Sequence, residues 1–221
     1  MGARQLDFTS AASTVIDHVV IATCDVNATA AMITEQCGVP TEIGGHHVGL
    51  GTWNRLVSFG DGRYLEIIGP DPDQPAPDRA RPFGLDTITD VDHARVATVC
   101  LRPSDITAAI AAAAALGVTY DGPTDTSRQS PAGLLRWRLS FPADDENGAI
   151  AFLIDWEDTP HPSRTVTGGL ELASLDLTHP EPDRIAALYT AMGCNLAVTA
   201  GPAGWSATLR GPAGERVVDS R

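Results

Sequence analysis

The chain contains no lysine, so all 15 of its basic residues are arginines, and they face 28 acidic residues for a formal net charge of −13. So acidic a composition, without a basic stripe, argues against nucleic acid as a partner. No apolar run approaches the roughly 18 residues that a membrane span needs. The four cysteines form no Cys-x-x-Cys pair, which favours reduced, half-buried thiols over a disulfide framework.

The first six residues also lack the apolar core of a signal peptide, so we expect a cytoplasmic protein. A chain of 221 residues with 43% hydrophobic content can bury a sizeable core, either as one large domain or as two small ones.

An internal repeat is the strongest pattern in the sequence. Three short apolar stretches each follow a helix-capping residue and end at a glycine. The first opens at Asp25, the second at Ser104 or Asp105, and the third follows Pro182. The stop glycines at positions 38, 117 and 193 are 79 and 76 residues apart, which indicates that one unit occurs three times.

Each predicted helix is preceded by one strand-like run and followed by three more, as β-branched and alternating residues suggest. The runs before the helices are 14–22, 95–102 and 170–178. Those after the helices are 41–47, 53–59 and 63–68; 123–129, 134–141 and 149–156; and 196–200, 205–210 and 215–219. The order strand, helix and three strands therefore recurs as a βαβββ unit. Pro- and Asp-rich residues 69–83 predict an exposed linker after the first unit.

Several segments resemble the glyoxalase-like branch of the vicinal-oxygen-chelate superfamily. They are DHVVI (17–21), GHHVGLGTWN (45–54), GRYLEIIGPDP (62–72), LLRWRL (134–139), FLIDW (152–156) and TPHP (159–162). The resemblance implies an α+β fold in which two modules, 14–69 and 94–157, pair into a curved, open, barrel-like sheet. We therefore expect a glyoxalase-like domain over 14–157 and a third, degenerate module over 165–221, which could pair with its equivalent in a homodimer.

In that superfamily a divalent metal is held by the first and last strands of each unit. By this resemblance His18 takes the first-strand position of unit one and Glu66 the last-strand position. Strand parity agrees, because residues 16, 18, 20 and 22 share one face, as do 64, 66 and 68. A His–carboxylate pair suits Mn²⁺, Fe²⁺, Ni²⁺ or Zn²⁺. Alternatively the two side chains bond each other, or act as a general base and its orienting partner.

The second unit departs from the pattern. Its first-strand position corresponds to Ala97 or Thr98, and its last-strand position to Ile154, or to Asp155 if the register slips by one residue. The full four-ligand set of the superfamily is therefore not visible in the paired units.

Further residues are candidates for substrate binding. By resemblance we expect His47, Trp53 and Asn54 to line the pocket, while His46 points to solvent. Asp155 and Trp156 end the second unit near the expected mouth of the cleft.

Three further polar side chains can be interpreted from their local sequence. Arg138 could bind a carboxylate if it faces the cleft, or pair with the acidic surface if it faces outward. His161 and His179 each precede a proline, which is typical of solvated turns.

These features predict a glyoxalase-like enzyme with His18 and Glu66 as catalytic residues. The chemistry implied by the resemblance is metal-assisted isomerase, lyase or oxygenase chemistry on a small oxygen-rich substrate. The alternative is a non-catalytic protein of the bleomycin-resistance type, which binds or sequesters a small molecule.

Overall fold

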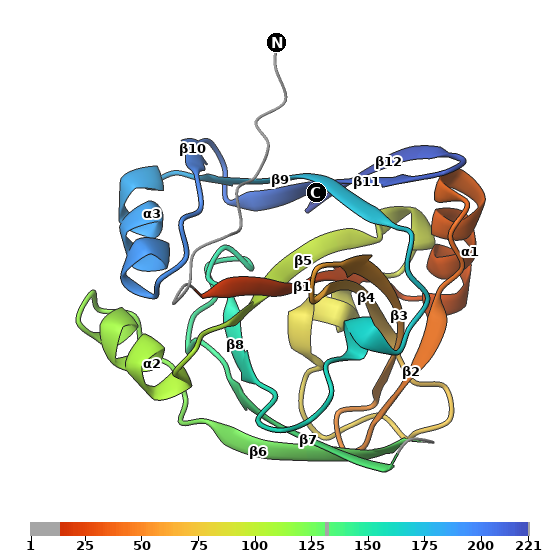
Figure 1. Cartoon of the computed structure of the whole chain (residues 1–221), viewed down its shortest axis with the longest axis horizontal. Coiled ribbons are helices and arrows are strands. Elements are labelled where there is room, and N and C mark those ends of the chain that lie inside the picture. The colour runs from red at the N-terminus through yellow and green to blue at the C-terminus, as the bar shows by residue number, and fades with distance from the viewer. Residues whose placement is uncertain (1–13, 131–132, 221) are drawn as a thin grey trace.

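The computed structural model describes residues 14–130 and 133–220. It contains the three predicted βαβββ units (Figure 1). The first comprises β1 (Val15–Ala22), α1 (Val26–Cys37), β2 (Glu42–His47), β3 (Thr52–Gly60) and β4 (Arg63–Pro70). The second comprises β5 (Arg95–Arg102), α2 (Ile106–Ala114), β6 (Thr124–Ser130), β7 (Gly133–Ser140) and β8 (Phe152–Asp155). The third comprises β9 (Glu171–His179), α3 (Pro182–Ala191), β10 (Val198–Ala200), β11 (Gly204–Gly211) and β12 (Gly214–Asp219).

The predicted aspartate caps begin α1 and α2, whereas α3 begins without a side-chain cap. A glycine with positive φ follows the end of each helix within three residues. The side chain of Asp25 accepts a hydrogen bond from the backbone N–H of Ala28, and Asp105 does the same for α2. After α1, Gly38 takes a left-handed φ of 76° and returns its N–H to the carbonyl of Thr34, so the chain can leave the helix without strain. At α3 the proline itself, Pro182, is the first helical residue.

The first two units join edge to edge into one eight-stranded sheet, in the order β2-β3-β4-β1-β5-β8-β7-β6. Strand β1 pairs in parallel with β4 and antiparallel with β5, so the first strands of the two units meet at the centre. The sheet curls until its edge strands β2 and β6 come into contact (Figure 1). Its inner face encloses a hollow. The predicted α+β fold with paired units is therefore confirmed.

The third unit forms a separate sheet, in the order β10-β9-β11-β12, that packs against the outer face of the large sheet. Strands β11 and β12 contact β5 and helix α1, and α3 contacts α2 (Figure 1). One hydrophobic cluster spans these layers, with Val19 and Leu101 from the large sheet and Leu177 and Trp205 from the small one. The division into domains 14–157 and 165–221, and the pairing of the third module in a homodimer, stay predictions.

A β-bulge in β1 overturns part of the predicted strand parity. The register of β1 on β5 shifts between Ile16 and His18, so Asp17 is an extra residue in β1. As a result Ile16 packs with Val19 in the hydrophobic cluster between the two sheets, called the outer cluster below. Val20 packs in a second hydrophobic cluster, on the inner face of the large sheet. The prediction that residue 16 shares a face with residues 18, 20 and 22 is therefore wrong.

The predicted linker 69–83 is more than an exposed joint. Asp71 is 2% exposed and holds the His46 ring through a contact of 2.7 Å between Oδ2 and Nδ1. Phe83, in the 3-10 helix η1 (Pro82–Thr87), faces the hollow of the large sheet.

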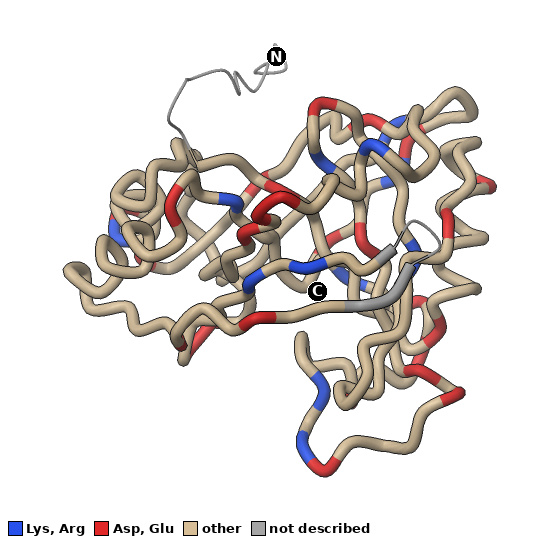
Figure 2. Tube along the Cα trace, turned by 60° about the horizontal axis from the view of Figure 1, so that its bottom comes forward, with Lys and Arg blue, Asp and Glu red and all other residues tan. Residues whose placement is uncertain are grey.

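Charged residues are spread over the described chain, with arginines scattered among the more numerous acidic residues (Figure 2). No helix in the described part of the chain is long and apolar enough to cross a membrane.

Candidate functional site

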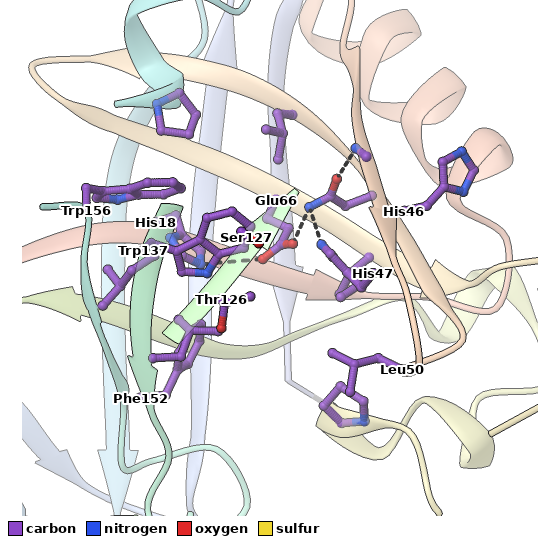
Figure 3. Close-up of a pocket in the computed structure, with 18 of the residues that line it drawn as sticks. His18, His46, His47, Leu50, Glu66, Thr126, Ser127, Trp137, Phe152 and Trp156 are labelled. Carbon is purple, nitrogen blue, oxygen red and sulfur yellow. Dashed lines mark hydrogen bonds and ion pairs between the residues drawn. The ribbon is translucent and has the colours of Figure 1, made fainter. Parts of the chain in front are cut away.

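The hollow of the large sheet is a cavity of about 630 Å³ whose two halves differ in chemistry. Its polar end comes from the first unit and contains His18 on β1, His47 on β2, Asn54 on β3 and Glu66 on β4. Its apolar wall is built largely by aromatic and aliphatic side chains of the second unit. These are Leu134, Trp137, Leu139, Phe141, Phe152, Ile154 and Trp156. Figure 3 shows Trp137, Phe152 and Trp156 grouped around His18 and Glu66.

The aromatic wall is closely packed. The rings of Phe141 and Phe152 stack with centroids 5.0 Å apart, and Phe83 approaches Phe152 at 5.7 Å. Trp137 and Trp156 pack at 5.6 Å. Offset or tilted aromatic pairs of this kind contribute about 0.5–1.5 kcal/mol each beyond the area that they bury, so the wall is rigid before any ligand binds.

Glu66 and His18 face each other at the polar end. Nε2 of His18 lies 3.4 Å from Oε2 of Glu66, and Nδ1 of His18 lies 2.8 Å from Oδ1 of Asp17. Because both ring nitrogens meet a carboxylate oxygen, the ring donates on both sides and is an imidazolium. His18 is also stacked on Tyr64, with ring centroids 4.5 Å apart.

Asn54 orients Glu66 from the other side. The Oδ1 atom of Asn54 accepts the backbone N–H of Gly45 at 2.9 Å, so its amide nitrogen must be the atom that donates to Oε1 of Glu66 at 2.5 Å. Gly44 makes room for this arrangement, because a Cβ there would lie 2.1 Å from Oδ1 of Asn54. The same amide nitrogen lies 3.4 Å from Nε2 of His47, whose Nδ1 lies 3.0 Å from the hydroxyl of Thr52.

The opposite charges of His18 and Glu66 raise the pKa of His18 and lower the pKa of Glu66. Burial alone would lower the pKa of His18, but hydrogen bonds to Asp17 and Glu66 and their negative charges raise it from 6.5 to about 9. Burial alone would raise the pKa of Glu66, but the hydrogen bond and charge of His18, together with His47 and Asn54, lower it from 4.5 to about 2. At neutral pH the two side chains therefore form an ion pair.

This ion pair predicts how stability depends on pH. The raised pKa of His18 gives a contribution that is complete below pH 6.5 and is lost as the pH rises through about 9. The lowered pKa of Glu66 gives a contribution that is present above pH 4.5 and is lost as the pH falls through about 2. We expect the melting temperature of the wild type to fall between pH 6.5 and 9, and the His18→Gln variant to show a smaller fall. The exposed-site variant His93→Gln should behave as the wild type, and an equal fall in His18→Gln would refute the assignment.

The predicted site residues divide into two groups. His18, His47, Asn54, Glu66 and Trp156 line the cavity, and His46 lines it while half of its side chain remains exposed. In Figure 3 the His46 ring points away from Glu66.

Trp53, Arg138 and Asp155 are not among the lining residues. Trp53 packs against the outer cluster, because neighbours on a strand point to opposite faces and Asn54 points inward. The Arg138 guanidinium donates to the carboxylate of Asp155 on the adjacent strand.

The sequence wrongly predicted the surroundings of two histidines. His161, expected in a solvated turn, is 6% exposed, and its Nε2 lies 2.8 Å from Oδ2 of Asp17. His179 is also buried, and its Nε2 lies 3.0 Å from Oε2 of Glu146. In both cases a distant carboxylate replaces the solvent, and no local pattern indicates such a partner.

The residues present do not fit the four-ligand metal site that the resemblance implies. His18 and Glu66 supply two donors, but in the second unit Ile154 lines the cavity with a hydrocarbon side chain. The Thr98 hydroxyl is engaged by the carbonyl of Gly148 at 2.9 Å. Within residues 14–130 and 133–220, no group of three or more His, Cys, Asp or Glu side chains could hold a metal ion.

Two paired βαβββ units that curl around a cavity, together with the matching family model, define a member of the vicinal-oxygen-chelate superfamily. The chain belongs to the glyoxalase-like domain family, whose model matches residues 16–193. No curated protein matches the chain.

Two solved structures are similar to the chain at low sequence identity. A hypothetical protein from Staphylococcus aureus is 13% identical with a TM-score of 0.56, and the match covers 93% of this chain and 85% of that one. Methylmalonyl-CoA epimerase from Mycobacterium tuberculosis is 16% identical with a TM-score of 0.48, over 72% of this chain and 98% of that one. These likenesses concern the fold alone.

Proposed function

We propose that this protein is an enzyme that binds a small, uncharged, oxygen-bearing molecule in the cavity and moves a proton on it with Glu66 and His18. The observation that carries the proposal is the ion pair at the polar end of an otherwise apolar cavity. His18 is an oriented donor and Glu66 an oriented acceptor, with 3.4 Å between Nε2 and Oε2.

The two halves of the cavity indicate the shape of the substrate. An apolar body, such as a ring or branched chain, would lie against the aromatic wall, where each Å² of apolar surface removed from water contributes about 25 cal/mol. A carbonyl or hydroxyl would lie at the polar end, where His18 and Asn54 donate hydrogen bonds. A carboxylate or phosphate there would meet the negative charge of Glu66, so an uncharged polar group is favoured.

The geometry supports a proton transfer once substrate is bound. Charge-assisted N–H···O hydrogen bonds are about 2.7–2.9 Å long, so the contact of 3.4 Å is loose and a substrate oxygen can insert beside it. Insertion weakens the mutual stabilisation of the pair, so the pKa of Glu66 rises and that of His18 falls. Glu66 then removes a proton from the carbon next to the carbonyl, and His18 stabilises the negative charge that develops on the oxygen.

This chemistry belongs to the isomerase and lyase classes. The resemblance also implied a Mn²⁺, Fe²⁺, Ni²⁺ or Zn²⁺ cofactor and oxygenase chemistry. Since the donor set does not fit the four-ligand site, the proposed steps use only side chains of this chain.

Exchange of substrate protons with solvent tests the proposal. We expect the wild type, incubated in D₂O with a panel of small aromatic and aliphatic ketones and aldehydes, to catalyse deuterium incorporation beside the carbonyl of at least one compound, measured by proton NMR. Replacing Glu66 by glutamine preserves the shape but removes the base, so the rate should fall by on the order of 100-fold or more. The control Glu171→Gln changes an exposed carboxylate on the third module and should exchange as the wild type does.

Two results would contradict this reading. Equal exchange rates in the wild type and Glu66→Gln would show that Glu66 is not the base. Near-stoichiometric transition metal in the purified wild type, lost in His18→Gln and Glu66→Gln, would replace the side-chain mechanism with a metal-assisted one.

The apolar second unit favours one alternative, a protein that binds a small hydrophobic compound without transforming it. Trp137 and Trp156 line the cavity, so binding should change tryptophan fluorescence. Compounds that bind with micromolar affinity but show no exchange in any assay would support this alternative.

A further inference from the structure

Asp17 is a buried carboxylate that lies outside the cavity lining and receives four donors. Nδ1 of His18 and Nε2 of His161 each lie 2.8 Å from its oxygens. Nε1 of Trp156 donates at 3.2 Å, and Nε of Arg102 lies at 3.3 Å. The side chain is fully buried, and although burial raises its pKa, the hydrogen bonds and charges of His161 and His18 hold that pKa well below the usual range. Besides the adjacent His18, donors from strand β5 and from residues 156–161 thus converge on one carboxylate.

The orientation of the His161 ring follows from its neighbours. The backbone N–H of Ser163 donates to Nδ1 of His161 at 3.2 Å, and the Ser163 hydroxyl lies 2.8 Å from the same nitrogen. Nε2 on the other side of the ring faces Oδ2 of Asp17 at 2.8 Å. His161 therefore meets Asp17 through Nε2, while Ser163 holds the opposite side of the ring.

The His18 ring is fixed on three sides. Tyr64 stacks on its face with centroids 4.5 Å apart, and Phe152 meets it edge-on at 5.4 Å. These two rings restrict the plane of the imidazole but do not distinguish its edges. Asp17 does, because a ring flip would replace the Nδ1 donor by a carbon and turn Nε2 away from Glu66.

We propose that Asp17 and His161 are positioning residues that hold the Nε2–H of His18 toward Glu66 and the cavity. This inference rests on the proposed function, in which His18 is the donor to the substrate. Neither side chain touches the substrate; each acts through the next along the series His161, Asp17, His18.

The connector between the second and third units, residues 157–170, is then part of the site. It carries His161 and is hydrogen-bonded to the first and second units. The backbone N–H of Arg136 donates to the hydroxyl of Thr159 at 3.0 Å, and the N–H of Ser58 donates to the carbonyl of Thr167 at 2.8 Å. The N–H of Thr167 also donates to Oε1 of Glu42 at 2.6 Å. These bonds hold the connector across the large sheet and keep His161 at Asp17.

Nitrogen NMR of the histidine rings tests the proposal on the full chain. In ¹⁵N-labelled protein at pH 7, the His18 signals are identified by their absence from His18→Gln. We expect Asp17→Asn to shift both ring signals of His18 and to remove the downfield signal of its Nδ1–H. His161→Gln should shift the same signals by a smaller amount, while the exposed-site control His93→Gln should leave them unchanged.

The outcomes separate this inference from the proposed function. His18 signals that stay within the spread of the control in the folded His161→Gln variant overturn it, and shifted signals support it, even if Asp17→Asn does not fold. With a compound that undergoes exchange, His161→Gln should lower kcat on the order of tenfold with little change in KM, because a misplaced donor weakens the transition state more than binding. If no compound exchanges, the proposed function fails while the NMR comparison still decides the roles of Asp17 and His161.

Discussion

Replacing Asp17 by alanine is expected to lower the free energy of unfolding by about 3–5 kcal/mol, since breaking a buried ion pair leaves its partner charge uncompensated. Asp17 is fully buried at the bulge of β1, and its removal deprives His18, His161, Trp156 and Arg102 of their shared acceptor. The cationic ring of His18 would then retain only Glu66. Urea denaturation followed by circular dichroism measures the loss.

The control for this experiment is an exposed aspartate on a strand. Asp176 lies on the outer face of β9, so Asp176→Ala should change stability little. Asp17→Asn should fall between the two, because the amide keeps one acceptor oxygen while losing the charge. A loss of less than about 1 kcal/mol in Asp17→Ala would mean that water replaces the carboxylate and that the four donors do not depend on it.

Truncating Trp205 should destabilise the whole chain rather than the third module alone. Trp205 is 2% exposed, and its indole N–H donates to the carbonyl of Gly148 in the second unit at 2.8 Å. Its ring also meets Tyr189 edge-on, with centroids 6.4 Å apart. A buried tryptophan replaced by alanine costs about 3–5 kcal/mol. Because the core cluster around it extends into the large sheet, we expect one cooperative transition at lower denaturant concentration.

Two probes followed together check this expectation. In Trp205→Ala the remaining tryptophans, at positions 53, 137 and 156, all lie in the first two units, so the fluorescence of this variant reports on those units. Far-ultraviolet circular dichroism reports on all three units. Coincident curves in the wild type and in Trp205→Ala would mean that the predicted modules 14–157 and 165–221 unfold as one. Separate transitions would make them independent domains. Val217→Ala, at an exposed position on β12, is the matched control.

Local signals account for what could be predicted. Capping aspartates at the first two helices, Pro182 at the third and the glycines after all three act within a few residues of themselves, so they identified the helices and with them the repeat. Alternation along a strand has a period of two residues, so it correctly assigned Tyr64, Glu66 and Ile68 to one face. The same rule separates Trp53 from Asn54, although the resemblance to the family suggested both for the pocket.

Long-range contacts account for the features that could not be predicted from the sequence. The bulge at Asp17 is a property of the pairing of β1 with β5 and leaves no mark in the alternation of β1 itself. Asp17 and His161 are 144 positions apart, and Phe83 reaches the cavity from a segment that has the composition of a linker.

The sequence by itself determined the three βαβββ units and the shared face of Tyr64, Glu66 and Ile68, because caps, turns and strand alternation are encoded within a few residues. The position of His18 was assigned by resemblance to the family. Only the tertiary structure decided the division of the cavity into a polar and an aromatic half and the clustering of donors on Asp17. Both depend on which distant strands pair, in which register, and on the connector that crosses them. The free energy of burying a charge is governed by all the groups that surround it, and those groups meet only in the folded chain.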